Sequence, residues 1–158
     1  MNWPFLLLWG LISTLILTTV LSAAQGLGLT RISLLFVLGT LFTSDRDLAK
    51  LIGFLVHLVN GWWIALIYAA VFHSLGMATW WLGAGMGLIH ALFVLVTVFP
   101  LLPGLHPRMA TEQRGPTPTR ELEPPGFLAL HYGRGTPLAV VVSHMIYGAV
   151  LGIGYRLA

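Results

Sequence analysis

The chain has 158 residues, of which 57% are hydrophobic and 8% are charged. A water-soluble domain cannot bury so large an apolar fraction, so the composition favours a protein that folds in a lipid bilayer. The formal charge of +3 comes from eight basic residues against five acids, and in so apolar a chain this excess indicates orientation across a membrane instead of nucleic-acid binding. The lack of cysteine excludes disulfides, thiolate metal sites and iron–sulfur clusters.

Four stretches approach the length of about 20 apolar residues that a membrane crossing requires. The first has small residues near its end, like a secretory signal, but it lacks a basic leader and is long enough to span, so we interpret it as a permanent helix. A further segment, Thr30–Phe42, is shorter and carries Arg31 near its start, which favours a half-membrane or interfacial helix. The four expected crossings are Trp3–Ala24, Leu51–Phe72, Trp81–Leu101 and Pro137–Tyr155.

The predicted fold class is therefore all-α: an integral membrane bundle of four transmembrane helices plus one short helix, in a single domain over residues 1–158. Ser44, followed by two aspartates, is expected to cap the second crossing. The connection over residues 102–136 is predicted to be an irregular loop on one membrane face, because eight of the nine prolines lie between Pro100 and Pro137.

Basic residues predict the orientation. If Thr30–Phe42 does not cross, all of them except Arg156 lie on the side of the proline-rich loop. By the positive-inside rule this side is cytoplasmic and both termini are outside, as in a bacterial inner membrane protein. If the short segment does cross, Arg31 changes sides and the bias survives, so charge alone does not decide the number of crossings.

Histidine occurs inside three of the crossings, as His57, His90 and His144. Counting inward from the loop-rich face at about 1.5 Å per residue places His57 and His144 at a depth of roughly 10 Å and His90 at roughly 16 Å. The three imidazoles are thus able to meet in one leaflet. Helical spacing adds Asn60 beside His57 and Tyr147 beside His144, and Ser143 precedes His144, which completes a candidate polar cluster.

Glycines in the same crossings predict close helix contacts. Gly83 and Gly87 lie one turn apart before His90, Gly148 and Gly152 repeat this spacing after His144, and Gly61 follows His57 by four residues. Small residues four apart let two backbones approach in lipid, where there is little hydrophobic drive for helices to associate.

Two interpretations of the histidines remain open at this point. Each imidazole can hydrogen-bond to a backbone carbonyl or to Asn60, Ser143 or Tyr147 and fasten the bundle. Alternatively, His57, His90 and His144 together bind a ligand, a haem or a transition metal, since ionisable groups inside a membrane usually belong to a site and imidazole is a good ligand for zinc, copper or haem iron.

The order of the segments "LLFVLGTLF", "GFLVHLVNGWWIALIYAA", "GLIHALFVLVTVFPLLPG" and "SHMIYGAVLGIGY" resembles a family of small bacterial membrane proteins known as a domain of unknown function. The resemblance covers nearly the whole chain apart from the long loop. It implies a compact helical bundle with these histidines inside, and it implies no reaction.

The sequence shows no nucleophile–base arrangement, P-loop or dinucleotide fingerprint, which favours a protein that is not an enzyme. The leading hypothesis is an accessory or binding subunit of a membrane complex, with the lipid bilayer and a membrane-protein partner or a second copy as its neighbours. The alternative is a haem- or metal-binding protein for electron transfer or sensing. A small transporter is the third hypothesis.

Overall fold

The computed structural model describes residues 1–111 and 113–157, and its elements are helical. Four helices are long and apolar enough to cross a membrane, so the predicted all-α membrane bundle is confirmed. They are α1 (Trp3–Gly26), α3 (Arg46–Leu75), a third crossing from Trp80 to Leu105, and α6 (Thr136–Gly154).

The short helix α2 (Leu34–Gly39) has six residues and is therefore only about 9 Å long, too short to cross a bilayer. It packs closely on the first part of α3 through two glycines. A Cβ on Gly53 of α3 would lie 1.7 Å from the Leu35 carbonyl oxygen, and a Cβ on Gly39 would lie 1.6 Å from the Ala49 oxygen. This backbone contact holds α2 against α3 near one end of the bundle.

The start of α3 differs from the sequence prediction. The helix begins at Arg46 instead of Leu51, and its N-cap is Asp45 instead of Ser44. The Asp45 carboxylate accepts hydrogen bonds from the amides of Asp47, at 3.1 Å, and Leu48, at 2.8 Å. A carboxylate is favoured at this position because it also faces the positive end of the helix dipole.

The third crossing consists of α4 (Trp80–Phe93), a π-helical turn η1 (Val94–Val98) and α5 (Phe99–Leu105). It runs past the predicted end at Leu101, so the irregular connection starts after Leu105 and not at residue 102. Pro100 explains the wide turn, because it has no amide to donate to the carbonyl four residues earlier and its ring crowds that carbonyl. The loop also contains the short segment η2 (Phe127–Tyr132), whose 3₁₀ turns are interrupted by left-handed backbone conformations at Leu128 and Ala129.

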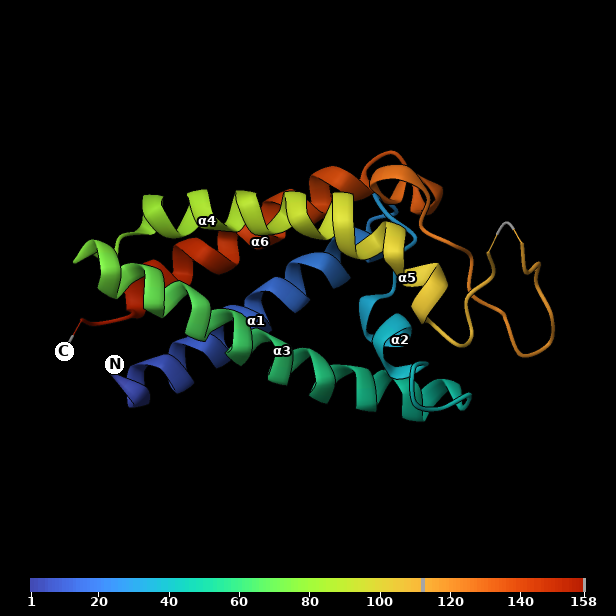
Figure 1. Ribbon diagram of the computed structural model, residues 1–158, viewed down its shortest axis with the longest axis horizontal. Coiled ribbons are helices and arrows are strands. Elements are labelled where there is room, and N and C mark those ends of the chain that lie inside the picture. The colour runs from blue at the N-terminus through green and yellow to red at the C-terminus, as the bar shows by residue number, and fades with distance from the viewer. Residues whose placement is uncertain (112, 158) are drawn as a thin grey trace.

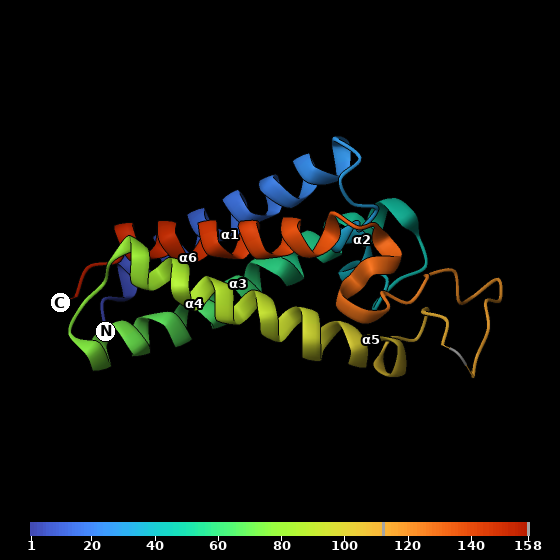
Figure 2. The ribbon, with the colours of Figure 1, turned by 90° about the horizontal axis from the view of Figure 1, so that it is seen from above.

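The crossings pack unevenly around the bundle. The α4 helix lies mainly on α6, whereas α3 lies on α1 and α2, and α1 also contacts α6. The helices α3 and α4 are joined at the end that holds both termini and diverge toward the proline-rich loop, with α1 and α6 behind them (Figures 1 and 2). Three tryptophans at the ends of the crossings are exposed: Trp3, Trp80 and Trp81.

The proline-rich loop is fastened to the short helix α2 by His106, whose side chain is 4% exposed. Its Nε2–H donates to the Val37 carbonyl oxygen at 3.0 Å, and its Nδ1 accepts from the Arg108 amide at 3.1 Å. Burial lowers the pKa of His106 below the ordinary value of 6.5. Arg31 adds a second attachment through an ion pair with Glu123, at 3.3 Å.

Candidate ligand-binding site

A cavity of about 310 Å³ lies inside the bundle and is lined by residues from α1, α2, α3, the third crossing and α6. Its walls are mostly apolar. The volume has room for roughly ten groups the size of a water molecule. Six polar side chains line it and are called the polar cluster below: Thr14, His57, Asn60, His90, His144 and Tyr147.

The cavity opens between α3 and the third crossing. Asn60 and Trp63 of α3 and Phe93 and Val98 of the third crossing line the cavity and are also exposed on the surface of the bundle. We call these four residues the mouth. Trp63 is 65% exposed and Phe93 is 54% exposed, so aromatic rings border the mouth on the outer surface of two membrane-length helices. In Figure 1, α3 and the third crossing diverge toward the end of the bundle that holds the proline-rich loop.

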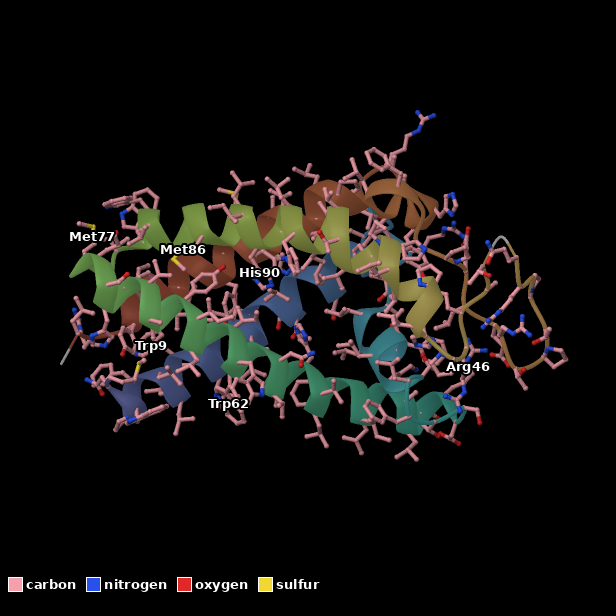
Figure 3. The ribbon with its side chains drawn as sticks, viewed as in Figure 1. Trp9, Arg46, Trp62, Met77, Met86 and His90 are labelled. Carbon is pink, nitrogen blue, oxygen red and sulfur yellow. The ribbon has the colours of Figure 1, made fainter. Side chains whose placement is uncertain are left out.

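Two of the three histidines are in direct contact. The rings of His90 and His144 meet edge to face, with their centroids 4.6 Å apart and their planes at 89°. Figure 3 shows His90 about midway along the bundle, pointing from α4 toward the interior. His57 lines the same cavity from α3, so all three predicted imidazoles face one space.

Hydrogen bonds fix the tautomer of His144. Its Nδ1 lies 2.8 Å from the Val140 carbonyl oxygen, and a carbonyl only accepts, so Nδ1 carries the proton. In the neutral ring Nε2 is then an acceptor. Ser143 is fully buried and donates to the same carbonyl at 2.9 Å; it supports His144 from within the helix and is not among the residues that line the cavity.

Three buried polar atoms near the cavity have no hydrogen-bond partner in the part of the chain that the structure describes. They are His57 Nε2, His90 Nδ1 and the hydroxyl of Tyr68. The Tyr68 ring lies against His90, at a centroid distance of 6.3 Å, and against Tyr147, at 5.5 Å. A buried polar group without a partner costs about 1–3 kcal/mol. A bound molecule that gave these three atoms hydrogen-bond partners would therefore stabilise the folded protein.

The predicted packing glycines lie at helix contacts. A Cβ on Gly83 of α4 would be 1.9 Å from the Gly148 carbonyl oxygen of α6, and one on Gly87 would be 2.2 Å from the His144 oxygen. Gly152 lies on the Thr79 carbonyl just before α4, and Gly61 of α3 lies on the Thr14 side chain of α1. The backbones of α4 and α6 therefore touch next to the paired imidazoles.

The described residues contain no group of three or more histidine, cysteine, aspartate or glutamate side chains that could hold a metal ion. His57, His90 and His144 share a cavity without forming such a group. His90 and His144 lie close together, and His144 already uses one nitrogen for a backbone carbonyl.

Sequence reasoning did not identify Thr14, Tyr68 or the two aromatic residues of the mouth. A signal existed for Thr14, because Gly10, Thr14 and Thr18 repeat small residues at a spacing of four along α1. Tyr68 lies on the buried stripe of α3 that begins at Gly61. The mouth had no such signal, since exposed tryptophan and phenylalanine at membrane depth do not differ in pattern from ordinary lipid-facing residues.

Comparison with known proteins adds no relative: no family model, curated protein or solved structure matches the chain. The fold and the cavity define the class of the molecule, a helical membrane protein with an internal cavity that opens between two of its membrane-length helices.

Proposed function

We propose that this protein is a binding component of the membrane and not an enzyme, and that it takes an apolar molecule from the bilayer into the cavity between α3 and the third crossing. One observation carries the proposal: the cavity opens between two membrane-length helices, and its mostly apolar walls include His57 and His90, each with a nitrogen that has no hydrogen-bond partner among the described residues. Pockets that bind small molecules typically combine apolar walls with a few oriented polar groups.

The orientation and the subunit role belong to the same proposal. The proline-rich loop lies on the cytoplasmic face of a bacterial inner membrane, because basic residues gather at its end of the bundle. The loop is fastened to α2 through His106 and to the connection between α1 and α2 through Arg31, and it would present a shaped surface to a membrane-protein partner or a second copy. Cross-linking in native membranes followed by purification tests this part; a protein that always migrates alone would contradict it.

A second candidate is haem or metal binding for electron transfer or sensing, supported by the partnerless nitrogens of His57 and His90. A single axial imidazole is sufficient for some haem sites. The absorption spectrum and the metal content of the protein purified from native membranes test this candidate, and a colourless, metal-free protein that still carries an organic ligand would reject it.

The main test is to plug the cavity. Val94 of η1 lines it and is half-buried, whereas Val96 in the same turn is 56% exposed and does not line it. Val94→Trp should fill the space, and Val96→Trp adds the same ring on the lipid side. Molecules that co-purify in mild detergent are identified by mass spectrometry for each protein.

We expect an apolar compound to accompany the wild-type protein and Val96→Trp and to be lost from Val94→Trp. Equal amounts of every compound in all three proteins would mean that nothing occupies the cavity, and the proposed function would be wrong.

A further inference from the structure

We infer that the cavity selects an uncharged molecule that carries a hydroxyl group, a lipid alcohol, over carbonyl compounds and over anionic lipids. This inference rests on the proposed function, because it specifies what the same cavity holds. It follows from which hydrogen atoms of the polar cluster are already committed to backbone carbonyls.

Two side chains of α6 offer only acceptors to the cavity. The Nδ1–H of His144 is used by the Val140 carbonyl, which leaves Nε2 as an acceptor. The hydroxyl of Tyr147 donates to the Gly61 carbonyl of α3 at 2.7 Å, so its oxygen retains only lone pairs. Both residues are buried and line the cavity.

A third acceptor comes from α1. The Thr14 hydroxyl donates to the Gly10 carbonyl at 2.7 Å, so its oxygen, which lies beside Gly61, has only lone pairs left to offer. The helices α6 and α1 thus supply three acceptor side chains. Each of them already donates its own hydrogen to a backbone carbonyl of the protein. A ketone, an ester or a quinone also presents acceptors and would leave these atoms unpaired, whereas a hydroxyl donates to one of them.

Two further members of the polar cluster, His57 and His90, suit the oxygen of the same hydroxyl. Both line the cavity, and each has a buried nitrogen without a hydrogen-bond partner among the described residues; a neutral imidazole carries one N–H donor that an alcohol oxygen accepts. Among the described residues, those that line the cavity include no lysine, arginine, aspartate or glutamate. An anionic headgroup would therefore be a buried charge without a partner, which is strongly unfavourable.

The experiment uses the full chain in lipid vesicles with two photoreactive probes of equal chain length, a long-chain primary alcohol and its methyl ether, each with a diazirine in the chain. Cross-linked residues are mapped by mass spectrometry. The two probes differ in one hydrogen bond, which the alcohol donates and the ether does not. The alcohol should therefore label cavity residues of α3 and the third crossing about tenfold more strongly than the ether.

Two unlabelled competitors distinguish the sources of the hydroxyl, a straight-chain alcohol and a diacylglycerol. Competition by either one supports the inference and shows which membrane alcohol the cavity prefers. Competition by an unlabelled fatty acid as strong as that by the alcohols would overturn it, because the cavity would then accept a carboxylate.

A matched pair of variants tests the acceptors. Tyr147→Phe should reduce labelling by the alcohol severalfold and leave labelling by the ether unchanged. Tyr155→Phe removes a buried tyrosine hydroxyl at the end of the same helix, bonded to His73 and outside the cavity, and should behave like wild type. Thr14→Val, which keeps the shape of the side chain, is a second cavity variant if Tyr147→Phe does not fold.

The outcomes separate the two proposals. Equal labelling of the cavity by alcohol and ether would overturn the choice of a hydroxyl and leave a binding cavity in place. Absence of cavity labelling by both probes would overturn the proposed function itself. Loss of alcohol preference in Tyr155→Phe as well as Tyr147→Phe would show that the tyrosine acts on the whole bundle and not on the ligand.

Discussion

The imidazole of His90 on α4 reaches the imidazole of His144 on α6 because their helices touch through a glycine. Gly87, three residues before His90, packs directly on the backbone of His144, where a Cβ would lie 2.2 Å from the carbonyl oxygen. This close approach lets the two rings meet with centroids 4.6 Å apart. Small residues on α4 thus determine the geometry of the site.

The first prediction concerns this contact. Gly87→Ala should destabilise the bundle by about 1–3 kcal/mol, because the added methyl group meets backbone that has to move. Gly85→Ala, on the same helix, is the control, since a Cβ there would meet nothing within 4 Å. This variant should leave the stability of the bundle unchanged or slightly raised. Unfolding in mixed detergent–SDS micelles provides the measurement; equal stability of the two variants would contradict the contact.

The second prediction concerns neighbouring tryptophans on α3. The Trp62 Nε1–H donates to the Leu7 carbonyl of α1 at 2.9 Å, while Trp63 is 65% exposed at the mouth of the cavity. Trp62→Phe should lower the free energy of unfolding by about 1 kcal/mol, because it loses a hydrogen bond between helices. Trp63→Phe should unfold like wild type. The same SDS titration measures both variants. A larger loss of unfolding free energy for Trp63→Phe than for Trp62→Phe would contradict the hydrogen bond between Trp62 and α1.

The third prediction is a pH dependence of the loop. Burial lowers the pKa of His106 below 6.5, so the folded protein takes up this proton less readily than the unfolded chain. Its contribution to stability is therefore present above pH 6.5 and is lost as the pH falls through the folded-state pKa. Protonating Nδ1 also breaks the bond from the Arg108 amide.

Hydrogen exchange of the loop amides, corrected for the intrinsic rate, measures this effect between about pH 7.5 and about pH 5. Protection of the amides of residues 108–111 should fall with decreasing pH in the wild-type protein. His106→Gln keeps a donor for the Val37 carbonyl and has no proton to gain, so its protection should not change with pH. An identical pH response in both proteins would show that another group controls the loop.

The fourth prediction concerns orientation and uses the absence of native cysteine. Met77→Cys lies at the end of the bundle that holds the termini (Figure 3), and Gln113→Cys belongs to the proline-rich loop, which occupies the opposite end (Figure 1). Both native residues are exposed. A membrane-impermeant maleimide should label Met77→Cys in intact cells and Gln113→Cys only after lysis. The reverse pattern would place the loop outside.

The number of crossings followed from the sequence, because about 20 apolar residues in lipid have no stable alternative to a helix. The ends of the helices were less well predicted. Asp45 caps α3 where Ser44 was expected, and the third crossing continues past two prolines to Leu105. Several residue types satisfy a cap, and a proline in a membrane helix is tolerated through a wide turn, so local sequence does not determine either boundary.

The candidate site was predicted in part. Counting along each helix placed three histidines at similar depth, because the rise per residue is constant. The same counting did not reveal which hydrogen atoms Thr14 and Tyr147 commit to backbone carbonyls, since the Tyr147 bond joins residues 86 positions apart. The mouth depends on the angle between α3 and the third crossing, which arises from the packing of the whole bundle.

The most direct test of the account is a measurement of the paired imidazoles in a bilayer. Solid-state NMR of histidine labelled with ¹³C and ¹⁵N, in lipid vesicles, reports both ring-to-ring proximity and the protonated nitrogen. We expect a correlation between the His90 and His144 rings, with His144 neutral and protonated at Nδ1. Rings that correlate with acyl chains and not with each other would contradict an inward-facing polar cluster and, with it, the proposed binding site.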